Sequence, residues 1–209
     1  MEPLRAGNGK ADAAVAAIRA GKPVVIPTDT VYGLCANPYR SETVERAYRL
    51  KGRQPQQPSA LLAPDVDMLF ECLPELRSRI GPLLRELLPG PVTLVVPNPA
   101  RRYRWLTGSN PEAIGIRVPE LPEVSAAIVG RVGALMATSA NFPGGEDPRR
   151  VDEVPQEIRD GCGAVVDGGE LPGTPSTVID LTTAEPKVLR DGAVPAESVL
   201  ARVVSLAAE

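Results

Sequence analysis

Residues 24–34, with the sequence Val-Val-Ile-Pro-Thr-Asp-Thr-Val-Tyr-Gly-Leu, constrain the fold of this chain more than any other stretch. The apolar run at 24–26 predicts a buried strand, because β-branched side chains pack well on a covered, pleated surface. Pro27 has no N–H to donate to a neighbouring strand, so it predicts the end of this one. The polar residues 28–30 then follow the carboxyl end of the strand, which is where ligands bind in open α/β sheets.

Two cations, Lys51 and Arg53, follow further along the chain with Gly52 between them. Gly33 permits a turn or a close approach of the backbone to another group, and we expect a helix between the polar loop and the two cations. The segment therefore predicts a strand, a polar loop, a helix, and a cationic pair that returns to the same crevice. The alternative is an ordinary turn followed by a solvated pair of charges.

The rest of the chain alternates between short apolar runs and helical patterns. We expect helices at residues 10–20, 41–50, 73–88 (broken near Pro82), 122–129, 152–159 and 196–207. We expect strands at residues 59–63, 92–96, 114–118, 134–141, 164–167, 177–181 and 187–190, the last two as an antiparallel pair. Because helices and strands interleave while some strands are adjacent, the pattern indicates an α/β fold with a mixed sheet of parallel and antiparallel strands.

The composition excludes several classes of site. The 209 residues contain no histidine, which rules out Ser-His triads, histidine-ligated metals and imidazole acid–base chemistry. A net charge of −3 and an aromatic content of 3% argue against a chain-wide basic nucleic-acid surface and against base stacking on aromatic rings. We expect one domain over residues 1–209 with an ordinary core.

The cysteines and the hydropathy pattern indicate in which part of the cell the protein is found. Cys35, Cys72 and Cys162 are odd in number and lack metal-binding spacing, which favours reduced thiols in a cytoplasmic protein. No apolar run reaches the roughly 18 residues that a membrane span requires, and no signal-like segment opens the chain.

Polar side chains follow several of the expected strands. They occur at residues 28–30, 51–53, 139–141 and 175–177 and at Arg190. Arginine grips phosphate through two parallel hydrogen bonds and lysine binds it as a point charge, so together these groups suit a polyanion. Taken singly, each cluster can equally be a turn, a helix cap or a surface charge. The sequence has no P-loop and no Gly-x-Gly-x-x-Gly motif, so a nucleotide would need a different cradle.

Read together, these motifs resemble the YrdC-type threonylcarbamoyl-AMP synthases. The resemblance covers roughly residues 10–195 and rests on the order and spacing of Pro-Thr-Asp-Thr-Val-Tyr-Gly-Leu at 27–34, Lys-x-Arg at 51–53, Pro-Gly-Pro-Val-Thr at 89–93, Gly-Ile-Arg-Val-Pro at 115–119, Ser-x-Asn at 139–141, Ser-Thr-Val-Ile-Asp at 176–180 and Leu-Arg-x-Gly at 189–192. It implies the YrdC-like fold, a twisted mixed sheet with flanking helices and a concave basic face, in the short single-domain form.

The resemblance also implies an activity. Such an enzyme, a nucleotidyltransferase, condenses L-threonine, bicarbonate and ATP to threonylcarbamoyl-AMP and pyrophosphate. Mg²⁺ is carried on the triphosphate and held largely by phosphates and water. The product feeds the tRNA threonylcarbamoyl-transfer machinery, and tRNA or double-stranded RNA is a candidate partner for the concave face.

The matching positions supply the implied site residues. ATP would contact Lys51, Arg53, Gln57, Ser139, Asn141 and Arg190, with Lys51 and Arg53 as the catalytic cations; threonine would contact Thr30, Leu62, Arg117, Ala137 and Ser176; no residue is assigned to a metal. Many relatives carry Asn-Pro-Leu where this chain has Gln57-Pro58-Ser59, and a histidine where it has Leu62. Gln57 can still hydrogen-bond a nucleotide, whereas Leu62 can only line the pocket.

Two other functions fit the same residues. One is a non-catalytic protein of this fold that binds double-stranded RNA or tRNA through Arg101, Arg102 and Arg104, for which a solvated loop is the structural alternative. The other is a carbamoyl-transfer domain that uses carbamoyl phosphate, although such domains usually lie within longer chains. The intact Lys-x-Arg and Ser-x-Asn motifs favour catalysis.

Overall fold

The structure, a computed structural model, describes residues 6–207. Its helices and strands, in chain order, are α1 (Ala6–Arg19), β1 (Val24–Pro27), β2 (Tyr32–Ala36), α2 (Ser41–Lys51), β3 (Ala60–Leu62), α3 (Val66–Cys72), α4 (Glu75–Arg79), α5 (Gly81–Leu87), β4 (Val92–Pro97), η1 (Arg104–Leu106), β5 (Ala113–Arg117), α6 (Glu123–Val132), β6 (Leu135–Ser139), η2 (Val151–Glu153), α7 (Gln156–Gly161), β7 (Ala164–Val165), β8 (Thr177–Asp180), β9 (Lys187–Arg190) and α8 (Ala196–Ala207).

The strands form one mixed sheet in the order β7-β1-β2-β6-β3-β5-β4-β8-β9. β1 pairs with β7, β3 with β5, and β4 with β8 in parallel, and the other neighbours are antiparallel. The predicted antiparallel pairing of the last two strands is confirmed. The mixed sheet with flanking helices that the sequence predicted is therefore present.

The segment that follows the first strand differs from the prediction. β1 does not lead through a polar loop into a helix, because the short strand β2 intervenes and pairs with β1 in antiparallel register, Pro27 opposite Tyr32. Residues 28–30 therefore lie in the turn of a hairpin. Thr28 stabilises this turn: its hydroxyl donates to the carbonyl of Val31 over 2.7 Å and accepts from the Thr30 N–H.

Proline residues interrupt two of the helices that the sequence predicted. The expected helix at 73–88 is interrupted at Ile80, which caps α5, and Pro82 lies in the first turn of α5, where its missing N–H costs nothing. The helix expected at 152–159 is split by Pro155 into η2 and α7. The sequence did not predict α3. None of the described helices is long and apolar enough to span a membrane.

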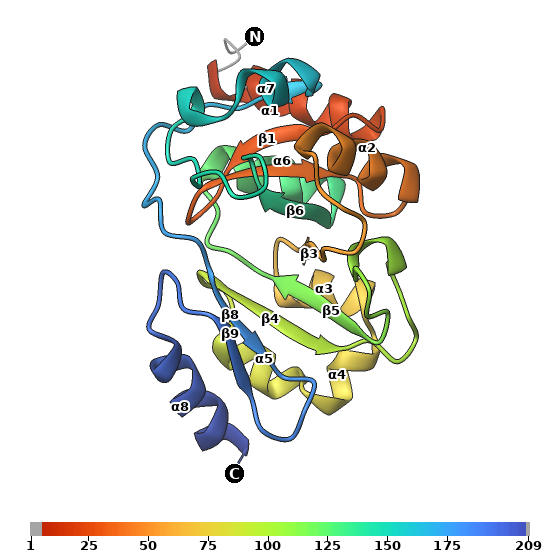
Figure 1. Cartoon of the computed structure of the whole chain (residues 1–209), viewed down its shortest axis with the longest axis vertical. Coiled ribbons are helices and arrows are strands. Elements are labelled where there is room, and N and C mark those ends of the chain that lie inside the picture. Colours follow the sequence, from red (N-terminus) through yellow and green to blue (C-terminus); the bar gives the residue numbers. More distant parts are fainter. Residues whose placement is uncertain (1–5, 208–209) are drawn as a thin grey trace, which may run out of the picture.

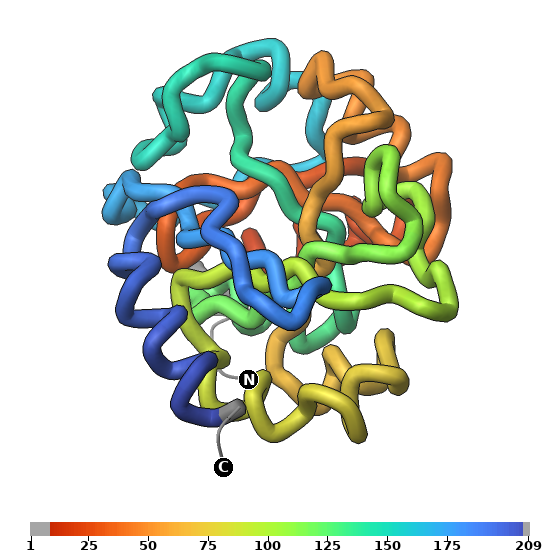
Figure 2. The backbone as a smooth tube through the Cα atoms, turned by 60° about the horizontal axis from the view of Figure 1, so that its bottom comes forward, coloured from red at the N-terminus to blue at the C-terminus, as the bar shows by residue number. Residues whose placement is uncertain are grey.

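Two layers of helices cover different parts of the sheet (Figure 1). α1 and α6 pack against each other and, with Val24, Cys35 and Leu135, form one apolar cluster. A second, larger cluster joins α2, α3, α4, α5 and α8 to the opposite side of the strands. Figure 2 shows α8 running beside α5, with which it is in contact.

In the described part of the chain, one face of the sheet has no helix over β5, β4, β8 and the start of β3. The burial pattern along β4 alternates, with Leu94 in the core and Thr93 and Val95 only half-buried. The same alternation places Ile179 in the core and Val178 and Asp180 on the open face. Because successive side chains of a strand point to opposite faces, these half-buried residues form the floor of a cavity.

Candidate functional site

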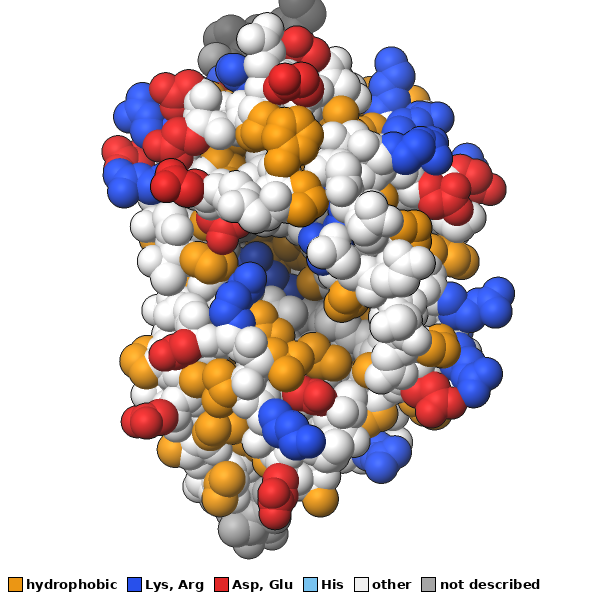
Figure 3. Space-filling view, in the orientation of Figure 1, with side chains coloured by type: hydrophobic (Ala, Val, Ile, Leu, Met, Phe, Trp, Pro, Cys, Tyr) orange, Lys and Arg blue, Asp and Glu red, His pale blue; other side chains and the backbone are white. Residues whose placement is uncertain are grey.

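The cavity has a volume of about 420 Å³ and is built mainly on the open face of the sheet. Its floor comes from side chains or glycines of adjacent strands at matching registers, with Ala60 opposite Gly115 and Gly115 opposite Val95. The rim comes from the loops around residues 58, 107–110 and 182. Figure 3 shows the corresponding hollow in the middle of the molecule, with Lys and Arg side chains inside its rim.

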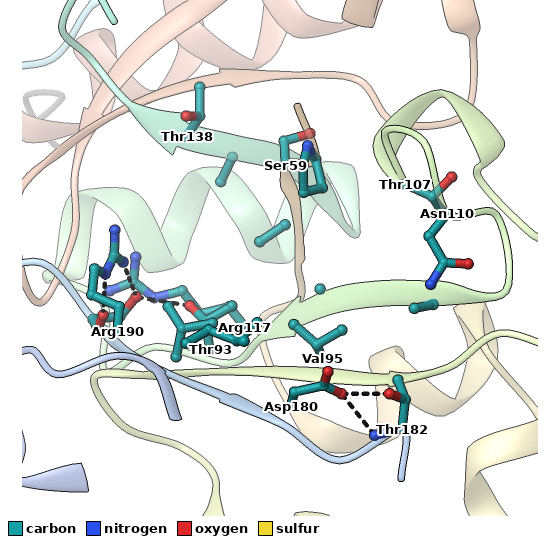
Figure 4. Close-up of a pocket in the computed structure, with 18 of the residues that line it drawn as sticks. Ser59, Thr93, Val95, Thr107, Asn110, Arg117, Thr138, Asp180, Thr182 and Arg190 are labelled. Atoms are coloured by element: carbon teal, nitrogen blue, oxygen red, sulfur yellow. Dashed lines mark hydrogen bonds between the residues drawn. The ribbon is translucent and has the colours of Figure 1, made fainter. Parts of the chain in front are cut away.

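A cationic group closes one end of the cavity (Figure 4). Arg190, on β9, donates from Nε to the carbonyl of Ser176 over 2.9 Å and from Nη2 to the Ser176 hydroxyl over 3.1 Å. The hydroxyls of Ser176 and Thr93 share a hydrogen bond of 2.8 Å. This connected set holds a guanidinium and two hydroxyls at the same wall, which is an arrangement suited to an anion.

Arg117 lies beside this group and is 9% exposed. Its Nη2 donates to the carboxylate of Asp29, and to the hydroxyl of Thr30 over 2.7 Å. Its Nε is buried and has no hydrogen-bond partner among the described residues. Burial lowers the pKa of Arg117 from its ordinary value and raises that of Asp29, and in each case the partner's charge opposes the shift. The hairpin turn thus orients a buried arginine whose guanidinium is incompletely satisfied.

Arg53 also lines the cavity. It donates from Nη1 to the Thr138 hydroxyl and from Nε to the carbonyl of Gln57, both over 3.3 Å, and from Nη2 to the carbonyl of Pro58. The guanidinium carbon also lies 5.9 Å from the centre of the Tyr48 ring. Several groups of the α2–β3 connection therefore fix its position, and burial lowers its pKa from the ordinary value.

Lys51 does not line this cavity. It is 2% exposed, and its Nζ donates to the carbonyls of Ser139 and Asn141 and to Oδ1 of Asn141, each over 2.7 Å. Burial, reinforced by the charge of Arg53, lowers its pKa to about 8, while Asp147 opposes the shift. All three donors of its ammonium group are used, so Lys51 holds the loop after β6 in place.

The Ser139–Asn141 loop is further tied by its own side chains. The Ser139 hydroxyl donates to Oδ1 of Asn141 over 2.7 Å. Asn141 Nδ2 donates to the carbonyl of Gly145 over 2.7 Å and to Asp147 over 3.2 Å. Asn141 and Asp147 line a neighbouring cavity of about 310 Å³.

The structure brings together only part of the predicted set. The residues that line the larger cavity are Arg53, Arg117, Ala137, Ser176 and Arg190. Those that do not are Thr30, Lys51, Gln57, Leu62, Ser139 and Asn141. Gln57 is exposed in its loop. Leu62 was expected to line the pocket, but it packs in the apolar cluster under α6, because β3 points it to the part of the sheet face that this helix covers.

The structure also adds residues that the sequence did not single out. Thr93, Asn110, Asp180 and Thr182 line the cavity with polar groups. Thr93 and Asp180 stand in motifs that carry the family resemblance, and the alternating burial along β4 places Thr93 on the face opposite Leu94. Nothing in the sequence pairs Thr93 with Ser176, which lies 83 positions away.

The basic loop at residues 101–104 is not part of the cavity. Arg101 forms an ion pair with Glu112 over 2.6 Å, and Arg102 forms one with Glu75 over 2.9 Å. Two of the three arginines considered for RNA binding are therefore partly neutralised by neighbouring carboxylates. Arg104 lines a separate groove together with Arg49, Arg53 and Trp105.

Comparison with known proteins identifies similar chains. The family model Sua5_yciO_yrdC, described as telomere recombination, matches residues 16–192. A threonylcarbamoyl-AMP synthase from Pyrococcus abyssi is 33% identical over 87% of this chain, which spans only 54% of that relative. A putative threonylcarbamoyl-AMP synthase from Mycobacterium tuberculosis is 32% identical over 89% of this chain and 85% of the relative.

A solved structure shares the fold. The crystal structure of P. abyssi Sua5 complexed with L-threonine superposes with a TM-score of 0.85 at 31% identity, covering 97% of this chain and 59% of that one. The similarity therefore extends over nearly the whole of this chain.

Proposed function

This chain belongs to the Sua5/YciO/YrdC family, and from that premise we propose that it is an L-threonylcarbamoyladenylate synthase, a nucleotidyltransferase that joins L-threonine, bicarbonate and ATP. The observation that carries this proposal is the cavity lined by Arg53, Arg117 and Arg190. The cavity offers separate cations for a carboxylate and for phosphates. Relatives of the chain are named threonylcarbamoyl-AMP synthases.

We assign the amino acid to the end that contains Arg117. A guanidinium grips a carboxylate through two parallel hydrogen bonds, and the unpartnered Nε of Arg117 supports a further acceptor there. Thr30 acts through Arg117, since its hydroxyl already accepts from that side chain and is fully buried. Ser176 and Ala137 line the same cavity and complete the proposed contacts with threonine.

We assign the phosphates to Arg53 and Arg190. The carbamate of threonine attacks the α-phosphorus, and charge then grows on the phosphoryl oxygens and on the departing pyrophosphate. Fixed cations stabilise that charge without reorganising during the step, and holding the two reactants together supplies most of the remaining acceleration. Ser139, Asn141 and Gln57 would make neutral hydrogen bonds to the nucleotide at the edge of the site.

Magnesium is expected on the triphosphate. The described residues contain no group of three or more His, Cys, Asp or Glu side chains that could hold a metal ion. Mg²⁺ commonly keeps several waters and binds through substrate phosphates, so the ion would enter with ATP and add charge neutralisation to that of the arginines.

The product and its destination are part of the same proposal. Threonylcarbamoyl-AMP would pass to the machinery that modifies tRNA, and tRNA or double-stranded RNA remains a candidate partner for the concave face. The cytoplasmic location predicted from three cysteines, all free in this structure, stays a prediction.

The experiment that tests the function is a mass-resolved assay of ATP conversion. Complete reactions should yield threonylcarbamoyl-AMP and pyrophosphate, and reactions that omit threonine or bicarbonate should yield neither. Pyrophosphate release that is unchanged when threonine and bicarbonate are omitted would contradict the proposal.

A further inference from the structure

Asp180 is an acidic side chain on the floor of a cavity whose other charged residues are all arginines. One of its oxygens, Oδ1, accepts from the N–H of Thr182 over 2.8 Å and from the Thr182 hydroxyl over 2.6 Å. The hydrogen bonds and ion pairs of the described residues include none to its second oxygen. Figure 4 shows Oδ1 turned to Thr182 and the rest of the carboxylate on the cavity side.

The register of the strands places this carboxylate away from the threonine end. Val95 pairs with Gly115 on one side and with Asp180 on the other, so Asp180 lies two strands from β5. Arg117 lies two residues further along β5, which puts the two Cα atoms roughly 12 Å apart, given about 4.8 Å between strands and about 3.3 Å per residue. An amino acid as small as threonine cannot reach from one to the other, whereas a nucleotide can.

The surface between the two ends is apolar. Val95 and Val178 lie on the floor between them, and Leu189, which is 57% exposed, borders the cavity. Ala113 continues the apolar floor on the far side of Gly115 from Arg117. A flat apolar surface with a few polar groups at its end is typical of the binding site of an aromatic ring system. Asn110 and Thr182 add neutral polar groups at the same end as Asp180.

We propose that Asp180 recognises the nucleobase, its free carboxylate oxygen accepting a hydrogen bond from the exocyclic amine of adenine. This inference rests on the proposed function and assigns the specificity of that site for its nucleotide. An ionised carboxylate only accepts hydrogen bonds. Adenine presents an amine at C6, whereas guanine presents a carbonyl oxygen there, which a carboxylate facing C6 would repel.

The test compares three nucleotides that differ at C6 of the purine, and inosine triphosphate also carries a hydrogen on N1. ATP carries the amine, purine riboside triphosphate lacks it, and inosine triphosphate replaces it with a carbonyl. Hydrogen bonds to charged groups are the stronger ones, so equilibrium binding of the wild-type chain should favour ATP over purine riboside triphosphate by about 10-fold to 100-fold. Equal binding of ATP and purine riboside triphosphate would overturn the inference without any mutant.

Two variants then locate the effect. In Asp180→Asn the preference for ATP over purine riboside triphosphate should collapse, while the affinity for threonine stays unchanged. Thr182→Val is the matched control: it removes the hydroxyl that binds Oδ1 but leaves the carboxylate, so the preference should persist. If Asp180→Asn keeps the preference, or weakens all three nucleotides equally, the carboxylate does not contact the base amine.

The binding test is separable from the test of function. A wild-type chain that prefers ATP as predicted but forms no threonylcarbamoyl-AMP would refute the proposed function and leave the role of Asp180 standing. Product formation combined with an unchanged preference in Asp180→Asn would refute the role of Asp180 alone.

Discussion

At the residue scale, Lys51 differs most from its expected role. The sequence predicted a cation on the nucleotide, and the structure gives all three of its donors to the Ser139–Asn141 loop. A neutral amine has two donors, and its lone pair would face one of these acceptors. The contact of Lys51 with ATP stays a prediction, and we propose from these hydrogen bonds that Lys51 also positions the loop, with an effect on the reaction that depends on its proton.

A pH profile tests this role. The pKa of Lys51 falls from an ordinary 10.5 to about 8 in the folded chain, so activity should decline as the pH rises through about 8. Between about pH 8 and pH 10.5 the Lys51 side chain binds more protons in the unfolded chain than in the folded one. The contribution of Lys51 to the free energy of unfolding therefore rises with pH over this range. Loss of activity without loss of folding is the expected signature, measured by kinetics and by chemical denaturation.

Lys51→Met serves as the comparison for that profile. It should lose activity on the order of 100-fold, because a small displacement of a positioning loop carries that cost, and its residual activity should show no step near pH 8. The same step in both proteins would assign the titration to another group.

Arg117 combines two roles that sequence reasoning treated as alternatives. It was expected to bind the threonine carboxylate, with an ion pair to Asp29 or Glu120 as the alternative, and the structure shows the pair with Asp29. Arg117→Lys should therefore lower the melting temperature, because it loses the fork that binds Asp29 and Thr30. It should also raise the threonine requirement and leave ATP affinity nearly unchanged.

Thermal melting separates these two effects. Saturating threonine should raise the melting temperature of the wild type and of Asp29→Asn, which keeps the guanidinium, but not that of Arg117→Lys. An equal threonine shift in the wild type and in Arg117→Lys would show that Arg117 is not a substrate ligand.

At the element scale, the loop that carries Arg53 is set by a contact with the loop after η1. Gly108 has a φ of +62°, and a β-carbon there would overlap the carbonyl oxygen of Gln56. Ser59 also donates its N–H to the carbonyl of Leu106 over 2.9 Å. The position of Arg53 therefore depends on a glycine that lies outside the expected site.

Gly108→Ala should cost about 1–3 kcal/mol of folding free energy, from the strained φ and the overlap together, and should raise the ATP requirement by displacing Arg53. Gly169→Ala is the matched control, since its φ is +80° but no atom lies within 4 Å of a β-carbon there. It should lose stability without changing the ATP requirement. Equal ATP requirements in the two variants would show that the contact between Gly108 and Gln56 does not set the position of Arg53.

The elements also show where sequence reasoning worked. Residues 92–96 and 177–181 were both predicted as strands, and the structure confirms them. Their alternation between core and open face was not predicted and is seen only in the structure. β2 was missed because all five of its residues are buried, so it has no alternating pattern, and Gly33 within it resembled a turn. The cavity itself depends on pairings such as Thr93 with Ser176, which local patterns do not encode.

At the scale of the whole molecule, the site forms where helices stop covering the sheet. α1 and α6 cover one face over β1, β2, β6 and the end of β3, and among the described residues the same face continues without a helix over the start of β3 and over β5, β4 and β8. The chain carries a net charge of −3, yet every cationic side chain that lines the cavity is an arginine. Anionic substrates would thus be drawn to one concave region rather than to the surface at large.

The most direct test of the account follows the carbon of bicarbonate into the product. With ATP, L-threonine and ¹³C-bicarbonate, the wild-type chain should form a threonylcarbamoyl adenylate that is heavier by one mass unit, together with pyrophosphate. Arg53→Ala should remain folded and form it on the order of 100-fold more slowly, the usual cost of one lost transition-state contact. An adenylate without the label, or an Arg53→Ala variant with wild-type turnover, would contradict the account.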